Sequence, residues 1–480
     1  MTAPKGPTGQ VNTMRLGHKV IVLSSRFVAA IMLLSCVVRA DPTTPFQSGV
    51  AQVDADHYRP PLPESLTLDI ARQYALDTNP SLAAAAHRIE AATAVYKQAR
   101  SSYLPTLTAS ASAIHTHDTP MSQLFVGVEP YDSFTISAGL NWLIFDGFAR
   151  QGAVLAAREG EAMEENALAD GRRLLLRAVS TAFHSALLAS ENLGIAREDA
   201  AFNAGLAAEE RARLTAGRGS RSEVLNFDVR VGEAEDQVLV WDQQLEIART
   251  ALATLMAAPL ARLPEATVLA LPTPTGDAAK VPELEAELAH AMALRPDLSR
   301  QERAVQQAEA LVAVAKGECW PTVMLTAEYG ESRRDNPRFD DRADALSSVG
   351  VFLAWDFFTG GSRQLAVEEA RALVAASERE LDAARYQVLG EVRQEYQNLM
   401  TAVKRLGKRE DIHAKTLETR ELVAAEYRAG KQTVTRVNEV QQDVVSASGR
   451  LALARIRVIQ ARENLDAATG RNLEPVGTTP

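Results

Sequence analysis

Two kinds of hydrophobic periodicity run along this chain. Four short stretches alternate apolar and polar residues, which is the period of a β-strand. They predict strands at about 105–116, 133–145, 321–331 and 346–358. Each is about ten residues long, the length that crosses a bilayer at the usual tilt. We interpret them as membrane-crossing strands, because four short strands beside so much helix would make an unusual soluble sheet. A half-buried soluble sheet is the alternative.

The other periodicity is helical. A proline-free amphipathic pattern runs from Ala149 to Arg213 and predicts a helix of about 98 Å, at 1.5 Å per residue. In the second half of the chain, apolar residues at heptad-like spacing indicate helices packed side by side. These residues are Leu389, Val392, Tyr396, Leu399, Val403 and Leu406.

Glycines interrupt both long helices. The first helix breaks at Gly217 and Gly219, and the second breaks at Gly430. A return helix is predicted after each break, so each half of the chain contains a helical hairpin. The return helices are expected over 220–257 and 433–468, and one further helical run is expected ahead of each strand pair, over 67–102 and 282–317.

The two halves of the chain are copies of one unit. Asn79-Pro80 recurs as Arg295-Pro296, an offset of 216, and Trp142 recurs as Trp355, an offset of 213. From Trp142 onward the offset stays constant for more than a hundred residues. Chance similarity would not hold one offset over that length, so the chain is a tandem duplication.

The repeat defines the organisation of the chain. Each copy consists of a helix, a β-hairpin and a long helical hairpin. We expect the first repeat over 67–259 and the second over 283–470. The remaining segments are a signal peptide (1–40), an extended segment (41–66), a Pro-rich linker (260–282) and a C-terminal tail (471–480).

Composition fits close-packed helices better than large globular cores. Of 480 residues, 81 are alanine and only 5% are aromatic, and small side chains let helix backbones approach one another. The formal net charge of −10 argues against a nucleic-acid binder, which usually carries a basic face. Two cysteines and eight scattered histidines form no ligand motif, so no cofactor or metal is expected.

The N-terminus carries an export signal. Basic residues precede the apolar run 27–34, which is too short to cross a bilayer as a helix. Two processing routes stay open. Cleavage after Ala40 fits an ordinary signal peptide, whereas the sequence Leu-Leu-Ser-Cys ending at Cys36 resembles a lipobox, in which Cys36 would be lipidated. Met14 is an alternative start.

Four strands in one chain need further partners in a membrane. Lipid tolerates no open sheet edge, because unpaired backbone groups cannot hydrogen-bond there. A cyclic oligomer satisfies those edges, and three copies would close twelve strands into a barrel with a lumen. The expected fold class is therefore mainly α with a membrane β-barrel, in which a trimeric barrel is continued by an α-helical tube.

Four motifs lie in register on the duplicated frame. They are the strand-to-helix turns Ile144-Phe-Asp-Gly147 and Phe357-Phe-Thr-Gly360, and the helix tips Leu214-Thr-Ala-Gly-Arg-Gly-Ser220 and Tyr427-Arg-Ala-Gly-Lys-Gln-Thr433. In these motifs, and over about 66–472, the chain resembles the TolC-like outer-membrane efflux family of Gram-negative bacteria. The resemblance implies a homotrimeric, passive exit duct in outer-membrane lipid, with its helical tube in the periplasm. It also implies a periplasmic adaptor protein and an energising inner-membrane pump of the RND, ABC or MFS type, for efflux or type I secretion.

The same resemblance assigns the hairpin tips to adaptor docking. The matching positions are Leu214, Ala216, Gly217, Arg218 and Ser220 in the first tip, and Tyr427, Ala429, Gly430, Lys431 and Thr433 in the second. Local structure explains part of this set equally well, because a helix reversal favours glycine at positive φ and Ser or Thr caps the returning helix. Docking and capping are compatible roles.

Just past the tips, members of the family narrow the channel with acidic side chains. By register, Glu223 and Glu439 would face this periplasmic gate, and the Tyr427 hydroxyl would hold Glu223 and keep the hairpins closed. Arg436 stands where the well-known closed ducts carry an acid. We therefore expect an ion-paired Arg436–Glu439 latch rather than a cation-binding acidic ring; a solvated helix face is the alternative.

Two other classes of function are weaker. An exported helical scaffold without a channel would lack strands of bilayer length. An enzyme with Cys319 as its nucleophile has no histidine nearby in the sequence. Cys319 is therefore expected to be a small packed residue, and the chain is expected not to be an enzyme.

Overall fold

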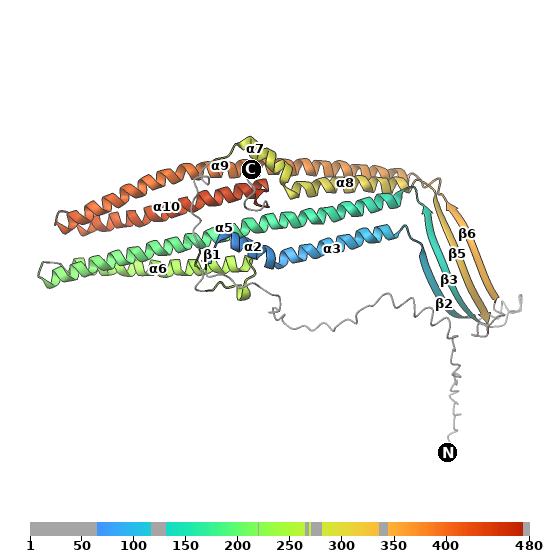
Figure 1. Cartoon of the computed structure of the whole chain (residues 1–480), viewed down its shortest axis with the longest axis horizontal. Coiled ribbons are helices and arrows are strands. Elements are labelled where there is room, and N and C mark those ends of the chain that lie inside the picture. The colour runs from blue at the N-terminus through green and yellow to red at the C-terminus, as the bar shows by residue number, and fades with distance from the viewer. Residues whose placement is uncertain are drawn as a thin grey trace, which may run out of the picture. The chain divides into compact units, whose positions relative to one another are not determined.

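The computed structural model of the chain describes residues 65–116, 131–218, 220–264, 268–269, 281–335 and 344–473. These residues fall into two units, a β-sheet and a larger helical unit (Figure 1). The expected signal peptide, Cys36 and most of the expected linker and C-terminal tail lie outside the described residues.

The sheet unit holds four antiparallel strands in the order β2-β3-β5-β6. Their bounds are β2 Thr106–Thr116, β3 Tyr131–Phe145, β5 Thr322–Arg334 and β6 Asp344–Ala354. Each copy of the repeat supplies one hairpin, and β3 pairs with β5 to join them. The four predicted strands are confirmed, but β6 ends four residues before its predicted end. The next partner in the register would be Pro321, which has no N–H to donate.

Trp142 and Trp355 have equivalent contacts in the two hairpins. The indole Nε1 of Trp142 donates to the carbonyl oxygen of Tyr103 at 2.9 Å, and that of Trp355 donates to the carbonyl oxygen of Cys319 at 3.3 Å. Because Tyr103 and Cys319 are also 216 residues apart, side-chain contacts follow the duplication seen in the sequence. Cys319 is exposed in the turn ahead of β5, so the expectation of a packed cysteine is wrong.

The helical unit contains the same set of helices twice. The first copy provides α2 (Leu68–Thr78), α3 (Pro80–Ser101), α5 (Ala149–Thr215) and α6 (Arg221–Leu255). The second provides α7 (Leu284–Leu294), α8 (Pro296–Gly317), α9 (Ser362–Arg428) and α10 (Val434–Thr469). Four short elements complete the set: β1 (Ser65–Leu66) pairs in parallel with β4 (Val268–Leu269), and 3-10 turns occur at Pro259–Ala261 and Arg471–Leu473. The expected long helix α5 and the two return helices are confirmed to within two residues.

A proline divides the helical run that we predicted as continuous in each copy. α2 and α3 are separated at Asn79, and α7 and α8 are separated at Arg295. These two residues adopt ψ values of 119° and 121°, outside the helical region. The ring of the following proline disfavours the helical conformation at the preceding residue, whereas proline itself suits the first turn of a new helix.

The long helices form a layer in the helical unit. α5 packs along α6 and α10, and α9 packs along α10, so the order is α6, α5, α10, α9 (Figure 1). α8 packs against both α5 and α9. The approach of α8 to α5 requires glycine, because a Cβ at Gly317 would lie 2.7 Å from the backbone nitrogen of Ala149. Among the described helices, none has an apolar stretch sufficient to cross a bilayer.

Equivalent apolar clusters stabilise the two copies. Val179 and Leu252 are fully buried in the first copy, and their equivalents Val392 and Leu465 are fully buried in the second. Leu399 of the predicted heptad-like seam is also fully buried. The seam is therefore confirmed as a line of packing between helices.

Candidate functional site

The first hairpin tip, between α5 and α6, is a Schellman turn. The N–H of Arg218 donates to the carbonyl oxygen of Arg213 at 2.9 Å, and the N–H of Gly217 donates to that of Leu214 at 3.0 Å. Gly217 has a φ of +72°, the left-handed conformation that a Cβ disfavours. Ser220 then caps α6, since its hydroxyl accepts a backbone N–H at 3.3 Å.

The second tip, between α9 and α10, repeats this geometry. The N–H of Lys431 donates to the carbonyl oxygen of Glu426 at 2.8 Å, and the N–H of Gly430 donates to that of Tyr427 at 2.9 Å. Gly430 has a φ of +73°, and the hydroxyl of Thr433 caps α10 by accepting a backbone N–H at 3.4 Å. The capping roles expected at both tips are therefore confirmed.

Most of the expected docking positions lie on the surface of the tips. The exposed residues are Leu214, Ala216, Gly217, Arg218, Ser220, Ala429, Gly430, Lys431 and Thr433. Tyr427 differs, because its side chain is buried and lies beneath the second tip. Arg218 and Lys431 occupy the same position of the two turns, so each turn presents a cation at that position.

An apolar cluster beneath the tips joins the two hairpins. It draws residues from all four long helices: Leu206, Ala207, Phe227, Val423, Tyr427, Val437 and Val440. The rings of Phe227 and Tyr427 meet edge to face, with centroids 6.4 Å apart. This cluster holds the two copies of the repeat against each other where each hairpin turns back.

A buried carboxylate lies beside this cluster. The Tyr427 hydroxyl donates to Oε1 of Glu210 at 2.8 Å, and Nη1 of Arg213 donates to the same oxygen at 2.9 Å. Glu210 is only 1% exposed. Burial, and then the hydrogen bond to the Glu210 carboxylate, raise the pKa of Tyr427 well above its usual range. The hydroxyl is therefore a donor at neutral pH.

The predicted hydrogen bond between Tyr427 and Glu223 is wrong. Glu223 lies in the first turn of α6, half-buried, and its charge adds to the rise in the pKa of Tyr427. The hydroxyl, however, binds Glu210. A carboxylate in an apolar cluster requires donors, whereas a half-exposed carboxylate is solvated by water.

The predicted pairing of Arg436 with Glu439 is confirmed. Nη1 of Arg436 lies 3.1 Å from Oε2 of Glu439, one turn further along α10. Both side chains are about half exposed, so the pair contributes on the order of 0.2–1 kcal/mol. Its part in a gate stays a prediction.

A second polar cluster, around Arg295, connects α8 with α9. The guanidinium of Arg295, 4% exposed, lies 2.7 Å from Asp297 and 2.6 Å from Glu391. Arg177 of α5 also binds Glu391, at 2.9 Å. The repeat identified Arg295 only as the equivalent of Asn79, and this cluster was not predicted. The sequence does contain a sign of it, because a charged arginine replaces the neutral Asn79 and Asp297 follows two residues later.

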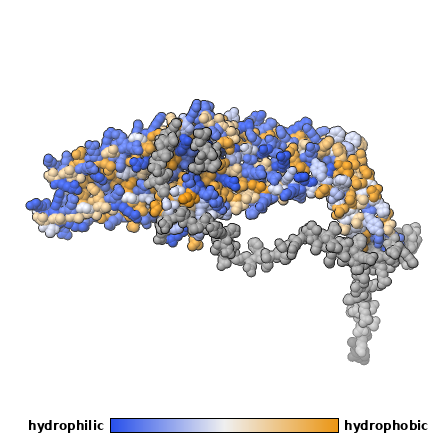
Figure 2. All heavy atoms as spheres, viewed as in Figure 1, coloured by the Kyte–Doolittle hydropathy of each residue, from blue (hydrophilic) through white to orange (hydrophobic). Residues whose placement is uncertain are grey.

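The sheet exposes large apolar side chains. Val349, Val351 and Leu353 alternate along β6 and are 78%, 69% and 67% exposed. Figure 2 shows hydrophobic side chains gathered over the strands, whereas the helices carry a mixture of polar and apolar ones. Such a face suits contact with lipid. Within the described ranges, no group of His, Cys, Asp and Glu side chains is arranged to hold a metal ion.

The profile of the outer membrane efflux protein family matches residues 71–258 and 288–471, one stretch in each copy. The chain therefore belongs to the outer membrane efflux protein family. It is 27% identical over 346 residues to the outer membrane efflux protein BepC of Brucella suis, covering 70% of this chain and 72% of BepC. It is 25% identical over 341 residues to the alkaline protease secretion protein AprF of Pseudomonas aeruginosa, covering 69% and 68%.

A solved structure shares the fold. The chain resembles the crystal structure of a membrane protein from Pseudomonas aeruginosa with a TM-score of 0.74 and 20% identity, over 84% of this chain and 90% of that one. The resemblance seen in the sequence is thus confirmed. The protein is located in the outer membrane with its helical part in the periplasm, and it is not an enzyme, so the nucleophile role considered for Cys319 is excluded.

Proposed function

We propose that this protein is the exit duct of a tripartite efflux or type I secretion system. The match of the family profile to both copies of the repeat carries this proposal. One relative is named for efflux and another for protease secretion, and a passive duct serves both purposes. The duct would conduct substrates outward, while an inner-membrane pump selects them and supplies the energy.

The edges of the sheet support a trimer. In the described sheet, β2 and β6 are edge strands, each with one row of backbone groups facing away from its neighbour. Those groups need partners in lipid. Three copies joined edge to edge would give a barrel of twelve strands with an open lumen. The layers of long helices, also open at α6 and α9, would join into a tube.

The hairpin tips supply the docking surface and the gate. The exposed residues of both tips would contact a periplasmic adaptor, with Arg218 and Lys431 as paired cationic contacts. The gate residues would be Glu223, Arg436 and Glu439, together with Tyr427, whose hydroxyl donates a hydrogen bond to Glu210. Because Tyr427 and Glu210 come from different copies, breaking their bond would let the two hairpins move apart.

Planar-bilayer recording of the purified full-length protein tests this function. We expect discrete conductance steps from a trimer, and a higher resting conductance for Tyr427→Phe. Tyr386→Phe, on the same helix and 76% exposed, is the matched control and should leave the conductance unchanged. A trimer that inserts into the bilayer without conducting would refute the duct. Normal steps with an unchanged Tyr427→Phe would refute only the gate.

A further inference from the structure

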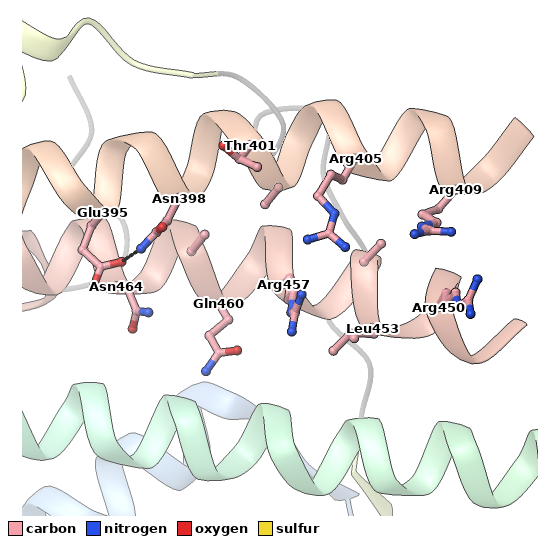
Figure 3. Close-up of a pocket in the computed structure, with 13 residues that line it drawn as sticks. Glu395, Asn398, Thr401, Arg405, Arg409, Arg450, Leu453, Arg457, Gln460 and Asn464 are labelled. Atoms are coloured by element: carbon pink, nitrogen blue, oxygen red, sulfur yellow. Dashed lines mark hydrogen bonds between the residues drawn. The ribbon is translucent and has the colours of Figure 1, made fainter. Parts of the chain in front are cut away.

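A groove between α9 and α10 has no part in the proposed function. It encloses about 330 Å³ and is lined by both helices. Arg405 and Arg409 come from α9, and Arg450 and Arg457 come from α10. Figure 3 shows Arg405 and Arg409 reaching from α9 toward α10, beside Arg457 and Arg450. Four guanidinium groups are thus gathered around one small opening.

These four arginines lack carboxylate partners within the part of the chain that the structure describes. The carboxylate that lines the groove belongs to Glu395, and it is already engaged by Arg177 at 3.0 Å and by Asn398 at 3.1 Å. Like charges held close together repel unless a counter-charge lies among them. The groove is therefore an electropositive site with unused hydrogen-bond donors.

The helical hairpin does not need these charges in order to form. At the 213-residue offset, the equivalent positions of the first copy are all neutral: Asn192, Ala196, Gln237 and Gln244. α5 and α6 nevertheless form a hairpin of the same design. The arginines are a property of the second copy alone, which points to a role beyond packing.

We propose that this groove is a binding site for small multivalent anions, such as phosphates and polycarboxylates. The planar fork of arginine matches the geometry of oxyanions and can donate two parallel hydrogen bonds to each. Side-chain amides of Asn398, Gln460 and Asn464 also line the groove and add neutral donors. The volume lies within the range of small-molecule sites.

Calorimetric titration of the purified full-length protein with inorganic pyrophosphate, at fixed ionic strength, tests the site. We expect saturable binding that weakens at least tenfold in the double variant Arg405→Gln/Arg457→Gln. The control is Arg379→Gln/Arg385→Gln, which also removes two positive charges. Both of these arginines are exposed on α9 and pair with carboxylates. It should bind pyrophosphate as the unmodified protein does.

Three results would overturn the proposal. The first is an absence of saturable binding. The second is equal weakening in both double variants, which would mean that overall charge attracts the anion. The third extends the first: the unmodified protein does not bind pyrophosphate, and the groove variant also fails to form oligomers. This result would mean that the arginines pair with carboxylates of a neighbouring subunit. Each result is independent of whether the protein conducts.

Discussion

The hydroxyl of Tyr427 on α9 donates a hydrogen bond to the carboxylate of Glu210 on α5, and this bond connects the two helical hairpins of one chain. It lies beside the apolar cluster beneath the tips, where water is largely excluded. Both copies of the repeat are therefore coupled at the end of the molecule that we propose to move.

Removing this hydroxyl should loosen the tips. In Tyr427→Phe the buried Glu210 carboxylate keeps only Arg213, and losing a hydrogen bond to a buried charged group costs on the order of 1–3 kcal/mol. Hydrogen–deuterium exchange should be faster in peptides covering 203–218 and 423–433. Tyr386→Phe should exchange like the unmodified protein. Unchanged exchange in Tyr427→Phe would show that the apolar cluster alone fixes the hairpins.

Alanine at two glycines of the first hairpin should have opposite effects. Gly217→Ala forces an alanine into φ +72°, which costs about 1 kcal/mol, and should speed exchange of the Arg218 amide. Gly194 lies inside α5, and a Cβ added there would meet no atom within 4 Å. Gly194→Ala should stabilise the helix by about 0.5–1 kcal/mol. Effects of the same sign would contradict the positive-φ argument.

Arg295→Gln should be severely destabilising. It leaves Asp297 and Glu391 without the guanidinium that binds both. Breaking a fully buried ion pair costs about 3–5 kcal/mol, which is the upper bound here because the two carboxylates are 35% and 26% exposed. We expect a lower midpoint of thermal unfolding. Arg379→Gln, whose side chain is 79% exposed and pairs with Asp382, should shift the midpoint little. Equal shifts would mean that the Arg295 cluster is no stronger than a surface pair.

Acid should weaken the fold through His184. Burial, and then the charge of Arg72, lower the pKa of this histidine from 6.5 to about 4. As the pH falls below 6.5, the unfolded chain takes up a proton that the folded chain resists until about pH 4. Stability from this group is therefore complete above pH 6.5 and is lost between pH 6.5 and 4, by about 2 kcal/mol at pH 5.

The matched variants isolate that histidine. In His184→Phe, the fall of the unfolding midpoint between pH 7 and pH 5 should be smaller than in the unmodified protein. His87→Gln replaces a histidine whose side chain is 76% exposed, and it should keep the full pH dependence. An equal fall in all three proteins would assign the acid sensitivity to other groups.

The frame of the fold was predictable because both copies repeat the same chemistry. Alternation of apolar and polar residues located the strands, and the proline-free amphipathic pattern located the long helices. The offset that stays constant from Trp142 and Trp355 onward then showed that both copies share these elements. The divisions before Pro80 and Pro296 were also readable, since proline restricts the residue ahead of it. They were missed because the amphipathic pattern continues across both sites.

The hydrogen-bond partner of Tyr427 could not be predicted from the sequence. Glu210 lies seven residues before Gly217 and Glu223 lies six residues after it. Both carboxylates are therefore at nearly the same distance from the tip along the hairpin. Only the packing of the four helices selects which carboxylate is buried. Likewise the charges of Arg405 and Arg457 were visible along the chain, but their convergence depends on how α9 lies against α10.

The number of strands in the sheet has a geometrical consequence. Four is even, so the two edge strands β2 and β6 run in opposite directions. Identical copies arranged by rotation can then meet with antiparallel pairing at every seam, without a special edge. An odd number would force one parallel seam per subunit. The duplication, by adding a whole hairpin, preserves this parity, and each chain can close a ring with copies of itself.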